Sequence, residues 1–121
     1  MTRINVAIPV EELTREHLIS EHREIKRIPN MIKSGRAKIK NIPPKFKLGP
    51  GHVKFFYDKL LFLKKRYEEL YNEGLRRGYN FTYFGDAWND LPQELMNDYI
   101  PSKEDEIIIR ERINERLKNN L

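Results

Sequence analysis

The feature that most constrains the fold is a wide apolar stripe in the middle of the chain. Apolar and aromatic side chains recur there every three or four residues, which is the spacing of one face of an α-helix. The stripe consists of Val53, Phe56, Tyr57, Leu60, Leu63, Tyr67, Leu70 and Leu75. It predicts a helix over residues 52–77, and Gly78 suits the C-terminal cap because glycine readily adopts a positive φ.

Two further helices are predicted on either side of this one. Helical spacing of apolar residues predicts one over residues 11–34, kinked by Pro29 and ended by Ser34 and Gly35. Ser102 and Asp105 resemble a capping box and predict another over residues 103–118. Loops should span residues 35–51 and 79–101, the second with aromatic residues that cover the core. We therefore predict an all-α fold, a single compact domain over residues 1–121, with three main helices and long irregular loops.

Composition narrows the possible functions. The 121 residues contain no cysteine, which excludes disulfides, thiolate metal sites and a cysteine nucleophile. The three histidines show no metal-ligand spacing, so we expect neither a metal nor another cofactor. No signal peptide and no apolar run of about 20 residues is visible. We expect an intracellular, cytoplasmic protein without a membrane partner.

Positive charge is concentrated in the first half of the chain. Residues 1–66 hold 16 Lys and Arg against 6 Asp and Glu, and within residues 23–47 nine basic residues accompany a single acid, Glu24. Such a density is typical of a protein that binds a polyanion, although a solvated basic surface is the simpler alternative. We favour nucleic acid as the partner. By charge alone, Lys33, Lys45 and Lys47 are candidate phosphate contacts.

Four residues of the first predicted helix can share one face. Arg23 and Arg27 are four residues apart, Glu24 lies three before Arg27, and His17 lies seven before Glu24. One helix can thus present a histidine, a carboxylate and two guanidinium groups around one patch. The alternative is a ladder of surface ion pairs.

A second pair of basic residues lies near the end of the chain. Arg112 and Arg116 are also four residues apart on a predicted helix, so that their side chains can share one face. Glu111 and Glu115 stand beside them and leave an ordinary charged face as an equal alternative.

The second residue offers a possible nucleophile. Thr2 is small enough for an aminopeptidase to remove Met1, which would free the α-amine of Thr2. An α-amine has a pKa of about 7.7–8.0, so part of it is unprotonated at neutral pH and can form a Schiff base with a sugar carbon. If Met1 is retained, this nitrogen is an amide and cannot do so.

Several blocks of the sequence resemble the pyrimidine-dimer DNA glycosylase family, historically called phage-type endonuclease V. The most specific is Gly-His-Val-Lys-Phe-Phe-Tyr-Asp-Lys-Leu at residues 51–60. Further similarity lies at residues 1–5, 21–27, 48–50, 63–66, 75–78, 91–94 and 98–101. The resemblance implies a helical fold with the N-terminal segment threaded between the first two helices. It also implies catalytic roles for Thr2 and Glu24, and DNA-contacting roles for Arg3, His17, Arg23, Arg27, Arg112 and Arg116.

The implied activity is excision of a damaged pyrimidine followed by strand nicking. The Thr2 amine would attack C1′ of a cyclobutane-dimer nucleotide, and Glu24 would stabilise the charged sugar and assist β-elimination. The expected partner is double-stranded DNA with damaged bases or abasic sites, bound by a monomer. The alternatives are an abasic-site lyase, a glycosylase for another lesion, or an inactive basic DNA-binding protein. For His52, a role in starting a helix is the preferred interpretation over a DNA contact.

Two departures from the family concern specificity. The phage enzyme continues into an aromatic and basic tail that contributes to dimer recognition, whereas this sequence ends at Leu121. Glu16 and His22 also stand where the family has a glutamine and a tyrosine that approach DNA. We therefore expect dimer cleavage to be less selective than in tailed relatives.

Overall fold

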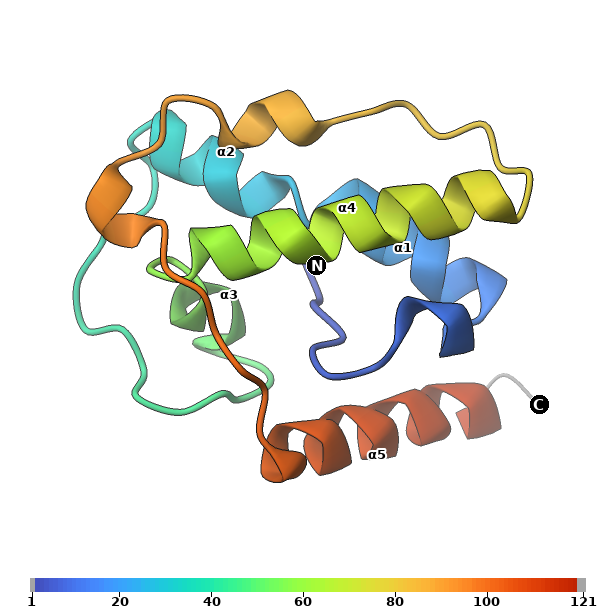
Figure 1. The fold of residues 1–121 in the computed structure, drawn as a ribbon. Helices are drawn as coiled ribbons and strands as arrows, with labels where there is room; N and C mark the ends of the chain where they lie inside the picture. The colour runs from blue at the N-terminus through green and yellow to red at the C-terminus, as the bar shows by residue number, and fades with distance from the viewer. Residues whose placement is uncertain (1, 120–121) are drawn as a thin grey trace.

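The computed structural model describes residues 2–119, and its regular secondary structure is helical (Figure 1). Its α-helices are α1 (Arg15–Glu24), α2 (Arg27–Lys33), α3 (His52–Phe55), α4 (Leu60–Arg76) and α5 (Lys103–Asn119). Short 3-10 helices are η1 (Val10–Glu12), η2 (Gly85–Trp88) and η3 (Gln93–Leu95). No strand occurs among the described residues. The predicted all-α class, with long irregular connections, is confirmed.

The first predicted helix is in fact two helices, α1 and α2. They are separated at Ile25 and Lys26, one turn before the proline that was expected to mark the kink. A proline ring clashes with the carbonyl four residues earlier, which here belongs to Ile25, so Pro29 displaces the break to that residue. Pro29 itself lies in the first turn of α2, where its missing N–H would have had no helical acceptor.

The second predicted helix is also interrupted, at residues 56–59 between α3 and α4. Lys59 leaves the helical conformation, with φ −127° and ψ 42°. A residue far along the chain stabilises the new helix start, because the carbonyl of Asn97 accepts from the N–H of Phe62 at 3.2 Å. The Asn97 side chain donates to the carbonyl of Asp58 at 2.9 Å. The prediction of one continuous helix was wrong because this partner is not local.

Both predicted caps are confirmed. Gly78 has φ 84°, and it ends α4 with bonds from its own N–H to Leu75 and from the N–H of Tyr79 to Gly74. At the start of α5, the N–H of Asp105 donates to Ser102 Oγ at 3.1 Å and the N–H of Ser102 donates to Asp105 Oδ2 at 3.0 Å. These motifs are set by residues within a few positions of each other, so the sequence predicts them well.

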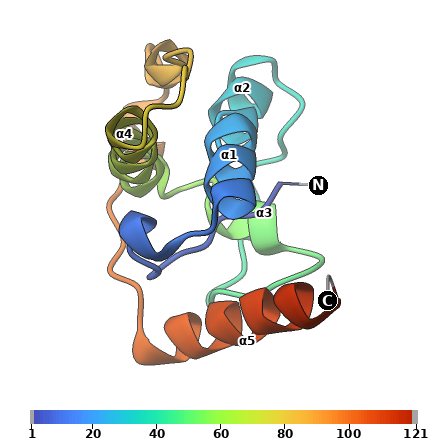
Figure 2. The ribbon, with the colours of Figure 1, turned by 90° about the vertical axis from the view of Figure 1, so that its right-hand side faces the viewer.

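The N-terminal segment, residues 2–9, runs through the middle of the molecule. Figures 1 and 2 both show it with α1 and α4 on one side and α5 on the other. Ile4, Val6 and Ile8 are almost fully buried in the same core as the stripe residues of α4. α5 contributes Ile109 to that core. The segment therefore contacts both of the first two predicted helices, through Glu24 of α1 and through His52 of α3 and Arg66 of α4, and it lies between α4 and α5.

A buried ion pair ties this segment to α1 and α4. Arg66 donates from Nε to Glu21 Oε2 at 2.7 Å and from a terminal nitrogen to Glu21 Oε1 at 3.0 Å. Its other terminal nitrogen donates to the carbonyl of Ile8 at 2.6 Å. The Asn5 side chain donates to Glu21 Oε1 at 2.9 Å. The two charged side chains, one amide side chain and one backbone carbonyl thus satisfy one another.

We expect Glu21→Gln to lower the free energy of unfolding by about 3–5 kcal/mol, because Arg66 would remain buried without a counter-charge. Glu106→Gln is the matched control, since Glu106 pairs with Arg110 on the exposed face of α5. The free energy of unfolding of this control variant should fall by no more than about 1 kcal/mol. Urea denaturation of both variants measures the difference, and similar losses would show that the buried pair is not special.

Candidate active site

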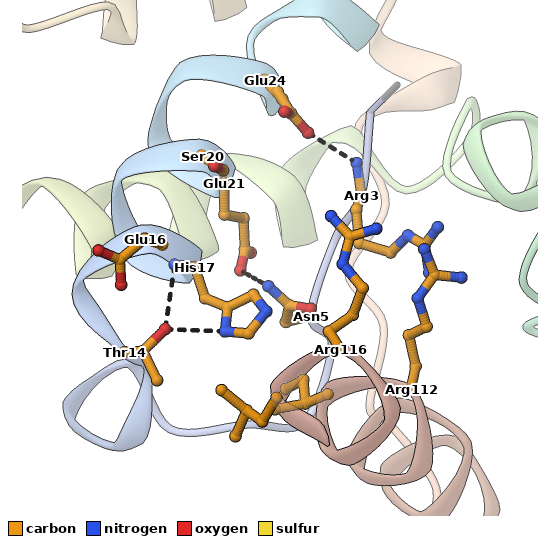
Figure 3. Close-up of a pocket in the computed structure, with 12 residues that line it drawn as sticks. Arg3, Asn5, Thr14, Glu16, His17, Ser20, Glu21, Glu24, Arg112 and Arg116 are labelled. Atoms are coloured by element: carbon orange, nitrogen blue, oxygen red, sulfur yellow. Dashed lines mark hydrogen bonds between the residues drawn. The ribbon is translucent and has the colours of Figure 1, made fainter. Parts of the chain in front are cut away.

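A cavity of about 640 Å³ opens between α1, the N-terminal segment and α5 (Figure 3). It is lined by Arg3, Asn5, Thr14, Glu16, His17, Ser20, Glu21, Glu24, Arg112, Ile113, Arg116 and Leu117. The lining thus combines two carboxylates near the N-terminal segment with three guanidinium groups and one imidazole. A second cavity of about 620 Å³ is lined by Lys45 among the candidate DNA contacts, and by none of the residues that line the first.

Glu24 meets the N-terminal segment at the end of α1. Its Oε1 atom accepts a hydrogen bond from the backbone N–H of Arg3 at 3.2 Å, as Figure 3 shows. Only 12% of its side chain is exposed, and Oε2 lies 3.5 Å from a terminal nitrogen of Arg23. Because the Arg3 N–H belongs to the peptide that joins Thr2 to Arg3, this contact brings half-buried Thr2 next to the carboxylate.

Three guanidinium groups converge beside this contact. Arg3 comes from the N-terminal segment, and Arg112 and Arg116 reach towards it from consecutive turns of α5 (Figure 3). Burial and then the charges of Arg112 and Arg116 lower the pKa of Arg3, while Glu24 opposes the change. In the described part of the chain, neither arginine of α5 forms an ion pair with Glu111 or Glu115. The positive field is therefore available to an anion in the cavity.

His17 forms another wall of the cavity. Its Nδ1 lies 2.8 Å from Thr14 Oγ1, and the same hydroxyl oxygen caps α1 by accepting from the backbone N–H of His17 at 3.2 Å. Burial, followed by the charge of Arg116, lowers the pKa of His17. The lowered pKa favours the neutral imidazole, and its second nitrogen lies on the cavity side (Figure 3).

Three predicted DNA contacts lie outside the cavity. Arg23 is exposed beside Glu24, and Arg27 is exposed in the first turn of α2. Lys33 donates to the carbonyl of Asp86 in η2 at 3.1 Å, which directs it away from Glu24. The structure therefore brings Arg3, His17, Glu24, Arg112 and Arg116 to one cavity and places the other three on the surface around α1 and α2.

His22, which stands where the family has a tyrosine, does not reach this surface. It is buried, its ring stacks on Phe81 with centroids 3.9 Å apart, and its Nε2 lies 3.1 Å from the Tyr67 hydroxyl. Burial lowers its pKa to about 4, so it is a neutral part of an aromatic cluster. Glu16, the second departure, is exposed and does line the cavity.

Two groups of site residues escaped the sequence analysis. Asn5 and Glu21 form the hydrogen-bonded floor of the cavity, and Thr14 and Ser20 belong to its wall. Helical spacing offers a signal for Ser20 and Glu21, which lie four and three residues before Glu24. Asn5 carries no such signal, because only its burial against α1 makes it part of the site.

His52 supports the segment from the side of α3. As predicted, it is at the start of a helix, but its ring does not cap that helix. The Nε2 atom lies 3.0 Å from the backbone nitrogen of Ile4, and Nδ1 lies 2.9 Å from the carbonyl oxygen of Lys47. Only 3% of the residue is exposed, and burial lowers its pKa to about 4.

Neither a metal centre nor a membrane span is recognisable in the described residues. Among residues 2–119, no three His, Asp or Glu side chains are grouped so that they could hold a metal ion. No helix in that part of the chain is long and apolar enough to cross a membrane.

The amino-acid sequence matches the model of a known protein family. A family model described as pyrimidine dimer DNA glycosylase matches residues 1–84 of the 121. The match spans the N-terminal segment and helices α1 to α4, and so includes Glu24, His17 and His52. Arg112 and Arg116 on α5 lie beyond it.

Proposed function

The chain belongs to the pyrimidine dimer DNA glycosylase family, a family of DNA repair enzymes, and from this membership we propose a bifunctional glycosylase and abasic-site lyase. The nucleophile is the α-amine of Thr2 after removal of Met1, and Glu24 is the acid–base group. The observation that carries the proposal is the hydrogen bond from the Arg3 N–H to Glu24. It supports a reaction centre that consists of the chain terminus and the lone carboxylate of a basic stretch.

In the first half of the reaction, the Thr2 nitrogen attacks C1′ of the damaged nucleotide. The bond between C1′ and the base breaks, and the base leaves with the bonding electron pair and takes up a proton. Glu24 stabilises the positive charge that develops on the sugar. Loss of a proton from nitrogen and opening of the sugar ring then give an imine between Thr2 and C1′.

In the second half, the protonated imine makes the C2′ hydrogens acidic. Glu24 accepts one of these protons, a C1′–C2′–C3′ conjugated system forms, and the C3′–O bond breaks. The departing 3′-phosphate carries away the electron pair, and water hydrolyses the imine to release the enzyme. Each step needs only the amine, the carboxylate and water.

The arginine groups suit the DNA backbone. Phosphates of the nicked strand are negatively charged and complement the positive charge of Arg3, Arg112 and Arg116 at the cavity. Charge-assisted hydrogen bonds from guanidinium groups to phosphate are strong and directional. Arg23, Arg27 and Lys33 extend the positive surface along α1 and α2, where they contact phosphates away from the reacting nucleotide.

The nucleophile is tested by chemical trapping. Active protein should lack Met1 by mass spectrometry, and borohydride should reduce the imine to a stable enzyme–DNA adduct on abasic DNA. Peptide mapping should place that adduct on Thr2, because its amine is the one that forms the imine. An adduct on a lysine side chain would contradict the assignment.

Replacement of Glu24 tests the acid–base role. Glu24→Gln keeps an oxygen that can accept from the Arg3 N–H, so DNA affinity should remain while excision falls about 10²–10⁴-fold. Glu69→Gln, on the exposed surface of α4 away from the cavity, is the matched control and should excise normally. Single-turnover kinetics measures both, and excision by Glu24→Gln at the wild-type rate would remove Glu24 from the mechanism.

Salt dependence tests the phosphate contacts. A neutralised phosphate contributes about −0.9 to the slope of log K against log salt, so Arg112→Ala should flatten that slope by about one unit and weaken binding to all sequences alike. Arg110→Ala is the control on the same helix, because Arg110 instead pairs with Glu12 and Glu106. Equal slopes for the two variants would mean that the cavity arginines do not meet phosphate.

A further inference from the structure

We propose that His52 is a positioning residue that holds the N-terminal segment so that the Thr2 amine meets Glu24. The inference rests on the proposed function, in which that amine is the nucleophile. It gives the histidine of the Gly-His-Val block a role that neither helix initiation nor a DNA contact provides. His52 does not line the cavity, so it can act on the reaction only through the segment that it holds.

The two hydrogen bonds of His52 define its protonation state. The backbone nitrogen of Ile4 can only donate, so Nε2 must be the unprotonated acceptor; the carbonyl of Lys47 can only accept, so Nδ1 must carry the hydrogen. The ring is therefore a neutral imidazole in one tautomer, with both nitrogens occupied. Burial, which lowers its pKa to about 4, favours the same state.

The surroundings of the ring fix its orientation. The rings of Phe46 and Phe56 pack edge-on against His52, each with centroids 5.5 Å away. The preceding residue, Gly51, has φ 93°, a backbone conformation that residues with a side chain rarely adopt. This turn lets the imidazole reach back to Lys47. His52 is thus anchored on one side by its own loop and presents the acceptor nitrogen to Ile4.

His52 can affect the position of Thr2 because the two hydrogen bonds hold consecutive peptide groups. The N–H of Arg3 is held by Glu24 on α1, and the next N–H, that of Ile4, is held by His52 on α3. One bond alone would leave the chain free to rotate about it, whereas two bonds to different helices hold two consecutive peptide groups, Thr2–Arg3 and Arg3–Ile4. The position of Thr2 follows from the orientation of the first of these groups.

Two polar substitutions of His52 test its hydrogen bonds to Ile4 and to Lys47 one at a time. In His52→Asn, the side-chain amide reaches the position of Nδ1 and can still donate to Lys47, but nothing accepts from Ile4. In His52→Gln, the side-chain oxygen reaches the position of Nε2 and can accept from Ile4. His52→Met keeps the approximate volume and makes neither bond. His22→Asn is the control, because His22 is also buried and neutral but contacts Tyr67 and Phe81 instead of the segment.

The experiment measures the single-turnover rate of borohydride trapping on abasic duplex DNA, the dissociation constant of the same DNA, and hydrogen exchange at the Ile4 amide. His52→Asn and His52→Met should slow trapping about 10²-fold with DNA affinity unchanged, because a misplacement of about 1 Å costs this much. His52→Gln should recover to within about tenfold of wild type. Ile4 exchange should accelerate in the Asn and Met variants alone, and His22→Asn should trap at the wild-type rate per folded molecule.

Equal trapping rates in the Asn, Gln and Met variants would overturn the positioning role, as would losses confined to DNA affinity. Failure of the proposed function is distinguishable. If the wild type forms no adduct at its N-terminus, the chemistry is wrong, but unequal Ile4 exchange in the Asn and Gln variants would still show that His52 holds the segment.

Discussion

The buried pair of Glu21 and Arg66 is the interaction on which the rest of the structure depends. A charge buried without a partner is costly, so this pair is tolerable only because every strong donor and acceptor around it is used. Two of the groups that complete it, the Asn5 side chain and the Ile8 carbonyl, belong to the N-terminal segment. The ion pair between α1 and α4 is therefore completed only when that segment lies against both helices.

This arrangement explains why a chain terminus can belong to a rigid site. Terminal residues are ordinarily poorly ordered, because few contacts tie them down. Here Ile4, Val6 and Ile8 are buried in the core, and polar contacts from Glu21, Glu24 and His52 hold the chain between them. Half-buried Thr2 then lies beside Glu24, at the edge of a cavity that Arg3 and residues of α1 and α5 line.

The sequence predicts those features of the fold that depend on near neighbours. The stripe of α4, the Gly78 cap and the Ser102–Asp105 box follow from spacing and local chemistry, and all are present. The break at residues 56–59 was missed because its stabilising partner, Asn97, is remote in sequence. The first break was placed at Pro29 instead of Ile25, because a proline acts on the carbonyl four residues before it.

The same distinction applies to the site. His17 and Glu24 line one cavity because they are seven residues apart on one helix, and this spacing can be read from the sequence. The meeting of Arg3 with Arg112 and Arg116 joins the two ends of the chain, so only the family resemblance pointed to it. The burial of His22 could not be predicted from its neighbours in sequence, since it depends on Phe81 and Tyr67 in other parts of the fold.

The cavity combines two parts that the fold supports separately. The N-terminal segment, Glu24 and His52 are held by contacts within the part of the chain that the family model matches. Arg112 and Arg116 stand on α5, which is joined to the rest through buried Ile109 and the ion pair of Arg110 with Glu12. In the function that we propose, changes in α5 would therefore alter phosphate binding without moving the Thr2 amine relative to Glu24. On that proposal, affinity for DNA and the chemistry of excision are physically separable in this fold.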